Sequence, residues 1–227
     1  AAEDAGEVVS LVAEVEKVVK AQAIVIDVIA PKTPEISLTK ESDLGVSNED
    51  GLTNDSSPTV SISFDTLAND GSAVVIGDIL QIFNNGITEE PYTLTQEDID
   101  NGFVELPLLN LETGSYFVSA SISDRAGNSS FVTSLKVTVD IDAPVFSSGA
   151  IAAAIDENTI ADQVIYTPTS SSDDVWKFEL VETNDSAIYF DQESGSVKLA
   201  VSPDFEAPIG DQYSFTLKAT DNAGNAS

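Results

Sequence analysis

The side chains that could carry chemistry in this sequence are nearly all carboxylates. Its 227 residues include 39 Asp and Glu but no His and no Cys. That composition excludes a zinc site of the usual ligand type, a thiolate nucleophile and a Ser–His pair. Carboxylates, together with amide and backbone carbonyl oxygens, are the ligands of hard cations, and Ca²⁺ takes about 6–8 such oxygens. Binding of a hard cation is therefore the chemistry that the residue types favour.

These acidic residues recur at equivalent places along the chain. The loop Asp124–Asn128 (DRAGN) recurs as Asp221–Asn225 (DNAGN), each time after a segment of alternating apolar residues. The string Ile26–Pro31 (IDVIAP) likewise recurs as Val139–Pro144 (VDIDAP), and in both the Pro ends a strand-like run. The repetition indicates two domains of one kind, joined by acidic linkers.

Short runs of β-branched and aromatic residues dominate the chain from residue 35 onward. They alternate between apolar and polar positions and are bounded by clusters of Gly, Pro, Asn, Asp and Ser, which is typical of strands. Even spacing without a long intervening helix predicts an all-β fold of tandem β-sandwiches. The predicted strands are Glu35–Thr39, Thr59–Phe64, Ile79–Asn84, Phe103–Leu106, Ser115–Ser123, Val132–Val139, Gln163–Thr167, Trp176–Glu182, Ile188–Asp191, Ser196–Ala200 and Gln212–Thr220.

The linkers divide the chain into three segments. Residues 1–28 are expected to be the end of a preceding or split domain, residues 29–142 one complete sandwich, and residues 143–227 a second sandwich. Within the first segment, residues 7–21 carry apolar side chains at both helical and strand spacing. A short N-terminal helix and a strand are therefore both open there.

The net charge of −30 excludes several classes of partner and function. It would repel a nucleic-acid backbone and an anionic membrane surface, and the single Arg cannot supply the phosphate contacts that nucleic-acid binding needs. No run of about 18 apolar residues is present, so no membrane insertion is expected. Because no pair of carboxylates is singled out for glycoside hydrolysis, we predict that the chain is not an enzyme.

A series of motifs connects both domains with known families. In the first domain they are Ser42–Ser47, Asp50–Asn54, Asp124–Asn128 and the linker acids, and this domain resembles a bacterial immunoglobulin-like extender repeat. The second domain resembles the cadherin-like repeats of giant bacterial repeats-in-toxin (RTX) surface adhesins, through Ala154–Asn158, Gln163–Thr167, Ser194–Leu199, Pro203–Glu206, Tyr213–Thr216 and Ala219–Asn225.

The resemblance implies both a fold and a function. The fold would be a pair of Greek-key sandwiches, one immunoglobulin-like and one cadherin-like. The function would be that of a calcium-rigidified extender in an extracellular adhesin at the bacterial cell surface, active in adhesion and biofilm formation. Its partners would be the neighbouring repeats of the same chain.

The resemblance also implies Ca²⁺ between consecutive domains, and the sandwich topology assigns the ligands. For each acidic residue the alternative is a hydrogen bond to its own turn, or plain solvation. At the first linker the implied ligands are Asp27, Asp70 and Asp124, with Ile29 where the second linker has Asp142. At the far end of the second domain, Glu157, Asp204 and Glu206 would form a half-site. At the second linker the ligands would be Asp43, Asp50, Asp140, Asp142, Asp173, Asp174 and Asp221, with Asp55 as a further candidate.

The sequence also allows a second function as an alternative to the extender. Loops such as Asn84–Pro91 could bind a sugar, a peptide or an ice surface, which would make the chain a ligand-binding module of the same kind of adhesin. Repetition favours the extender, because binding modules are usually singular and expose aromatic side chains. Trp176 alternates with apolar neighbours and is expected in the core.

The repeated loop also predicts an unpaired sheet edge. Ala2–Glu7 resembles a degenerate third copy of the loop, so the chain is expected to begin and stop within the same loop of two different domains. The second sandwich would then lack its final strand, and Ala23–Asp27 would be a final strand without its own domain. The open edge would be completed either by neighbouring sequence of a longer chain or by strand exchange with another copy.

Overall fold

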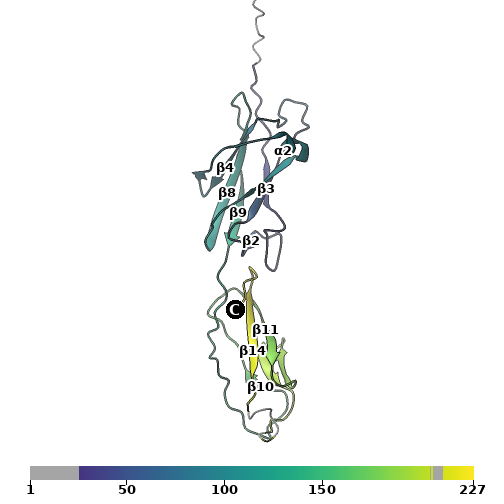
Figure 1. Cartoon of the computed structure of the whole chain (residues 1–227), viewed down its shortest axis with the longest axis vertical. Helices are drawn as coiled ribbons and strands as arrows, with labels where there is room; N and C mark the ends of the chain where they lie inside the picture. Colours follow the sequence, from purple (N-terminus) through teal and green to yellow (C-terminus); the bar gives the residue numbers. More distant parts are fainter. Residues whose placement is uncertain (1–25, 205, 207–211) are drawn as a thin grey trace, which may run out of the picture.

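The computed structural model describes residues 26–204, 206 and 212–227. Figure 1 shows two β-domains arranged end to end, with their long strands running roughly along the long axis. The predicted helix or strand at residues 7–21 lies outside the described residues, as does the predicted strand at residues 23–27 except for Ile26 and Asp27. The regular secondary structure of the described part is almost entirely β-strand, which confirms the predicted fold class.

The first domain packs two sheets against each other. The smaller sheet has the order β1-β3-β7 and is antiparallel throughout. The larger sheet has the order β2-β9-β8-β4-β5, with β6 also paired to β4, and its pairs are antiparallel except for the parallel pair β2–β9. The bounds are β1 Glu35–Leu38, β2 Leu52–Thr53, β3 Thr59–Ser63, β4 Ile79–Asn84, β5 Ile87–Thr88, β6 Tyr92–Thr93, β7 Phe103–Pro107, β8 Gly114–Ser123 and β9 Thr133–Val139.

The core of the first domain lies between these sheets because their strands alternate apolar and polar side chains. In β3, Val60 and Ile62 are fully buried, whereas their neighbours Thr59 and Ser61 are only partly buried. Each fully buried Val or Ile side chain contributes about 1.5–3 kcal/mol relative to its exposed state. The two β3 residues pack in one cluster with Leu80, Val118, Ile122, Val137 and Val139 of the facing sheet.

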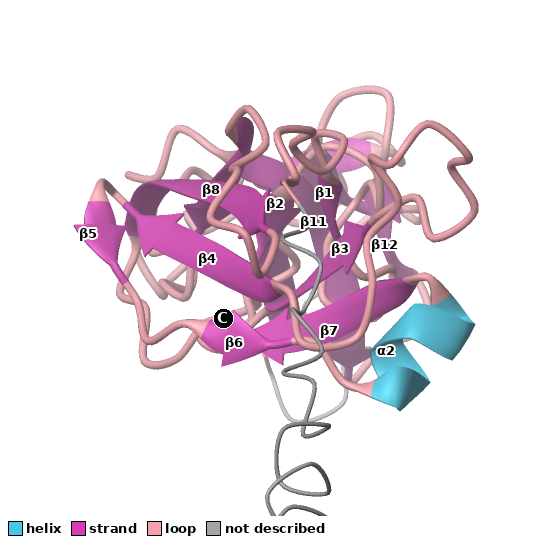
Figure 2. Ribbon diagram, turned by 90° about the horizontal axis from the view of Figure 1, so that it is seen from above, coloured by secondary structure: helices cyan, strands magenta, loops and turns pink. Residues whose placement is uncertain are grey.

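One helix in the described part was not predicted. Helix α2 (Gln96–Asn101) begins at Thr95, whose side chain accepts a hydrogen bond from the Asp98 backbone while the Asp98 carboxylate accepts from the Thr95 backbone. This reciprocal cap and the left-handed Gly102 at its end hold a six-residue helix beside β7, as Figure 2 shows. No helix among the described residues is long and apolar enough to cross a membrane.

The predicted strands agree well with the observed ones. All eleven are present, with ends displaced by a few residues at most. The strands that were missed, β2, β5 and β6, have two residues each, which is too short for an alternating pattern to appear.

The second domain has a smaller core than the first. Its described strands form one sheet in the order β10-β13-β12 and a separate pair β11–β14, all antiparallel. The buried residues of its core cluster are Ile165, Ile188, Val197 and Leu199. The bounds are β10 Gln163–Tyr166, β11 Val175–Thr183, β12 Ile188–Asp191, β13 Ser196–Leu199 and β14 Phe215–Asp221.

The prediction that Trp176 lies in the core is wrong. Its side chain is 56% exposed. The pairing of β11 with β14 shifts register between Val175 and Lys177, so Trp176 sits at an irregularity where alternation no longer decides which face a residue takes.

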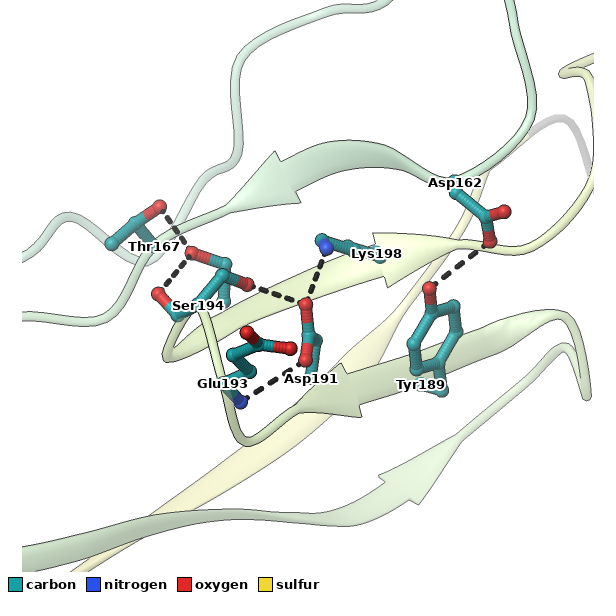
Figure 3. A network of polar contacts seen from close by, with 8 residues as sticks. Asp162, Thr167, Tyr189, Asp191, Glu193, Ser194 and Lys198 are labelled. Carbon is teal, nitrogen blue, oxygen red and sulfur yellow. Dashed lines mark hydrogen bonds and ion pairs between the residues drawn. The ribbon is translucent and has the colours of Figure 1, made fainter.

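Polar contacts support the β12–β13 hairpin of the second domain (Figure 3). The Asp191 carboxylate accepts hydrogen bonds from Lys198 Nζ and from Ser194 Oγ, and Tyr189 donates to Asp162 at 3.0 Å. The hydrogen bonds from Lys198 and Ser194 lower the pKa of Asp191 to about 2. This carboxylate is therefore satisfied within its own hairpin.

Candidate metal centre

Three carboxylates converge where the linker meets the second domain. Asp140 directly follows β9, Asp174 directly precedes β11, and Asp221 is the last residue of β14. Each offers one carboxylate oxygen, and these oxygens lie within 4.8 Å of one another. Asp221 is fully buried, and the other two are partly buried.

The repeated loop ties the linker to this group. The Asp221 carboxylate accepts hydrogen bonds from the Asn225 backbone at 2.8 Å and from Asn225 Nδ2 at 2.9 Å. Asn225 Nδ2 also donates to the backbone carbonyl of Asp140 at 2.8 Å, and the Asn222 backbone donates to the carbonyl of Asp174 at 3.1 Å. The two bonds from Asn225 Nδ2 and the bond from the Asn222 backbone therefore connect the linker, the repeated loop and the residue before β11.

The pKa of Asp140 in this group is shifted in the opposite direction from that of Asp191 in the β12–β13 hairpin. Burial, followed by the nearby charges of Asp221 and Asp174, raises the pKa of Asp140. None of the ion pairs among the described residues includes Asp140, Asp174 or Asp221. Carboxylates held together without a Lys or Arg, beside backbone carbonyls, fit a hard divalent cation and do not fit a softer metal that needs His or Cys.

Two other acids predicted for this junction lie in the first domain and are engaged in their own turns. Asp43 is buried, and its carboxylate accepts from the Gly51 backbone at 3.2 Å. Burial raises the pKa of Asp43. Asp50 accepts from the Leu52 backbone at 3.0 Å, and the further candidate Asp55 accepts from Ser57 at 2.8 Å. The structure does not bring these residues into the three-carboxylate group.

The remaining predicted acids of this junction are exposed. The Asp142 backbone donates to the Asp140 carboxylate at 3.1 Å, so Asp142 supports a ligand candidate while its own carboxylate stays outside the group. Asp173 is exposed and is also outside the group, although it adjoins Asp174.

A direct contact between the domains lies next to this group. The Val46 backbone donates to the Asn222 carbonyl at 3.1 Å. Gly45 has a φ of +111°, and a Cβ atom there would lie 2.5 Å from the Asn222 oxygen. The close approach of the two loops therefore requires a glycine at position 45.

We expect Gly45→Ala to loosen the angle between the domains while each domain stays folded. Small-angle scattering should show a wider distribution of maximum dimensions for this variant than for the parent. Gly86→Ala is the matched control, because Gly86 also has a positive φ (+79°) but a Cβ there would meet no atom within 4 Å. Both variants carry a backbone strain of about 1–2 kcal/mol, so superimposable scattering from the two would contradict the assigned contact.

The first linker repeats the loop geometry of the second. Asp124 accepts from the Asn128 backbone at 2.9 Å and from Asn128 Nδ2 at 2.8 Å, and Nδ2 also donates to the Asp27 carbonyl at 3.2 Å. Burial acts to raise the pKa of Asp124, but the bonds from Asn128 and from neighbouring backbone groups outweigh it and lower that pKa.

Asp78, rather than Asp70, occupies the third position at the first linker. Asp70 is exposed and accepts from Ser72 in its own turn. Asp78 directly precedes β4, as Asp174 precedes β11, and it is 1% exposed. Its Oδ2 accepts from the Val75 backbone at 2.9 Å, but its buried Oδ1 has no hydrogen-bond partner among the described residues.

The sequence contains a signal for Asp78. In both domains an Asp directly precedes the strand that pairs with the strand leading into the repeated loop. These are Asp78 before β4, which pairs with β8, and Asp174 before β11, which pairs with β14. Burial, and then the charges of Asp124 and Asp27, raise the pKa of Asp78, while the bond from Val75 lowers it. Asp27, Asp78 and Asp124 nevertheless do not converge as closely as the second group.

The acids predicted at the far end of the second domain do not form a group of three in the described part. Glu157, Asp204 and Glu206 are all exposed, and the Glu206 backbone donates to the Asp204 carboxylate at 3.0 Å. All three line one groove of the second domain.

A comparison with known protein families matches the first domain. Residues 30–141 match the model of the family described as bacterial Ig-like domain. No curated protein sequence matches the chain.

Several solved structures are similar to the chain at low sequence identity. Fibronectin(III)-like modules of Clostridium thermocellum CbhA are 14% identical, with a TM-score of 0.43, over 85% of this chain and 89% of theirs. A structure of a 1.5-MDa bacterial ice-binding adhesin, described in terms of host cell surface retention, is 18% identical, with a TM-score of 0.46, over 91% of this chain and 64% of its own. Drosophila N-cadherin EC1-3 is 14% identical, with a TM-score of 0.30, over 90% of this chain and 89% of its own.

Proposed function

We propose that this chain, whose residues 30–141 form a bacterial Ig-like domain, is a calcium-rigidified extender segment of a bacterial cell-surface adhesin. The observation that carries the proposal is the group Asp140, Asp174 and Asp221, which joins the linker to two strands of the second domain. The chain would hold an adhesive region away from the cell surface and so take part in adhesion and biofilm formation.

The mechanism follows from the charges at the linker. Three ionised carboxylates within 4.8 Å repel one another by about 3 kcal/mol per pair at an effective dielectric constant near 20. Without a cation this repulsion pushes the linker away from the second domain and leaves the joint loose. Asp140, Asp174 and Asp221 would hold Ca²⁺, whose charge would turn the repulsion into attraction and so hold the end of β9 to the start of β11 and the end of β14.

Repetition extends the mechanism along the chain. The same loop-to-linker hydrogen bond occurs at Asn128–Asp27 and Asn225–Asp140, so each domain meets its preceding linker in the same way. A series of such joints would form a rod when calcium is present. Extracellular modules bind Ca²⁺ with Kd values of about 10⁻⁴–10⁻³ M, which suits a role outside the cell.

Small-angle scattering in millimolar calcium and in excess EDTA tests the proposal. We expect the parent chain to give one extended, rigid shape in calcium and a broader range of shapes in EDTA. Magnesium at the same concentration is the control for ionic strength, because Mg²⁺ is smaller and demands a stricter geometry. Identical profiles in calcium and EDTA would overturn the proposed rigidification.

The alternative function, ligand binding, has one observation in its favour. The exposed Trp176 lines a shallow pocket of about 380 Å³ together with Ser172, Asp173 and Phe178. A specific hit on a glycan array would favour this function over the extender.

A further inference from the structure

The second domain contains an open groove along one edge of β14. It has a volume of about 1240 Å³ and lies between β14 and the segment at residues 146–157. Consecutive residues of β14 and its approach, Gln212–Leu217, line it, so the groove follows the strand edge rather than one face. The opposite edge of β14 is paired with β11, and no described strand pairs with the groove side. Figure 1 shows β11 on one side of β14 and the long segment before β10 on the other.

The groove has the character of a site for a β-strand. Its lining includes the apolar and aromatic side chains Ile155, Ile165, Tyr213, Phe215 and Leu217. An unpaired strand edge presents backbone N–H and C=O groups that an added strand can satisfy, while the apolar walls take its alternate side chains.

The first domain shows which strand belongs there. β8 is the equivalent of β14, because both lead into the repeated loop. The bond from Ser130 to the Ile122 carbonyl (2.8 Å) has its counterpart in the bond from Ser227 to the Ala219 carbonyl (3.1 Å). In the first domain β9 then pairs antiparallel along β8. The vacant edge of β14 therefore corresponds to the position of β9.

A second segment of this chain stands in the same position relative to its linker as β9 does. Alignment of the linkers IDVIAP and VDIDAP places Lys20–Ile26 at the positions of β9, Thr133–Val139. Ile24 and Ile26 then take the places of Val137 and Val139, which are both fully buried in the first domain. Val25 takes the place of Thr138, which is only partly buried.

We propose that the groove accepts Lys20–Ile26 of a second copy of this chain as an added antiparallel strand. The same copy cannot supply it. The seven residues lie next to Asp27, which is held by Asn128 at the end of the first domain away from the groove, and they can reach about 25 Å at most. β8 alone, with ten residues, spans about 33 Å of the distance between.

The arrangement that results is head to tail. The groove lies in the second domain and the donor segment precedes the first, so each copy can give one strand and receive another. Such a heterologous contact forms a ring only if the rotation between successive copies closes. Otherwise it produces filaments.

Sedimentation velocity of the full chain over a concentration series tests the proposal, in calcium and in EDTA. We expect the mean mass to rise with concentration. Deletion of residues 1–26 should leave a monomer at every concentration. Ile24→Asp should weaken association by at least about 10-fold, because its carboxylate would be buried without a partner. Val25→Thr is the matched control and should assemble like the parent, because β9 has Thr at the equivalent position.

A peptide added in trans gives a test that does not depend on the folding of a variant. A synthetic peptide with the sequence Lys20–Pro31 should compete for the groove and shorten the assemblies. A chain that is monomeric at every concentration would overturn the proposal, as would assembly that survives the deletion or Ile24→Asp unchanged. The deletion variant keeps Asp140, Asp174 and Asp221, so its melting temperature should still rise in calcium. A failure of strand exchange can therefore be distinguished from a failure of calcium binding.

Discussion

Millimolar calcium should raise the melting temperature of the second domain by roughly 10–20 °C relative to excess EDTA. A cation that binds only the folded state contributes about 2.7 kcal/mol at 100 times its Kd. For a domain of 60–100 residues, 1 kcal/mol corresponds to about 4–8 °C. Calorimetry with and without calcium measures the shift, and equal melting temperatures at neutral pH would contradict a cation at Asp140, Asp174 and Asp221.

The pH dependence of the same measurement provides an internal control. Because the pKa of Asp140 is raised above its ordinary value of 3.8, its contribution to stability is complete below that value and is lost as the pH rises through the raised pKa. Asp43 and Asp78 are shifted in the same direction. The pKa of Asp191, lowered to about 2, acts in the opposite direction, and its contribution is lost only as the pH falls below 3.8 towards that value.

In EDTA, acidification from neutral pH to about 4 should therefore raise the melting temperature of the second domain. In calcium the gain over EDTA should shrink over the same range, because protonated carboxylates no longer bind the cation. A melting temperature in EDTA that falls steadily over this range would show that repulsion at the junction is not significant.

Asp174→Asn should change stability in opposite directions in the two buffers. In EDTA the variant should be more stable than the parent, because one of three mutually repelling charges is removed while the size of the side chain is kept. In calcium it should be less stable, because a charged ligand is lost and the Kd should rise by about 10-fold, equivalent to about 1.4 kcal/mol. Calcium titrations followed by calorimetry measure both effects.

Asp173→Asn is the matched control for this variant. It removes the same charge one residue earlier in the chain, at an exposed position outside the three-carboxylate group. Its calcium affinity should stay within about 2-fold of the parent, since an exposed charge interacts weakly. Equal losses of affinity in the two variants would mean that the general negative field, and not a defined site, attracts the cation.

The strand pattern could be predicted because burial on one face imposes a two-residue period, as in Val60 and Ile62 of β3. The pattern fails where the backbone departs from that period. Trp176 lies at the register shift between Val175 and Lys177, and α2 depends on a capping interaction over four residues instead of a periodic apolar face. Local backbone geometry therefore set the limits of the prediction.

The site was predictable to the extent that topology alone brings ends of elements together. Asp174 and Asp221 adjoin strand ends at one end of the second domain, and Asp140 follows β9 in the linker that leads to that end, so strand order is enough to place the three side by side. Asp43 and Asp50 lie in a loop whose course depends on its own hydrogen bonds, and those bonds use both carboxylates within the loop. Proximity of a loop to a junction in the sequence does not determine where its side chains point.

The parallel pairing of β2 with β9 also decides how the first domain would respond to tension. A pull on the chain would enter before β1 and leave after β9, along the axis on which the strands lie (Figure 1). β9 is hydrogen-bonded to β2 on one side and to β8 on the other, and ladder bonds run across the strands. Tension would therefore shear both ladders at once, and β9 could not be peeled away one bond at a time. Survival under force would then depend on the rate of unfolding rather than on the equilibrium stability of the domain.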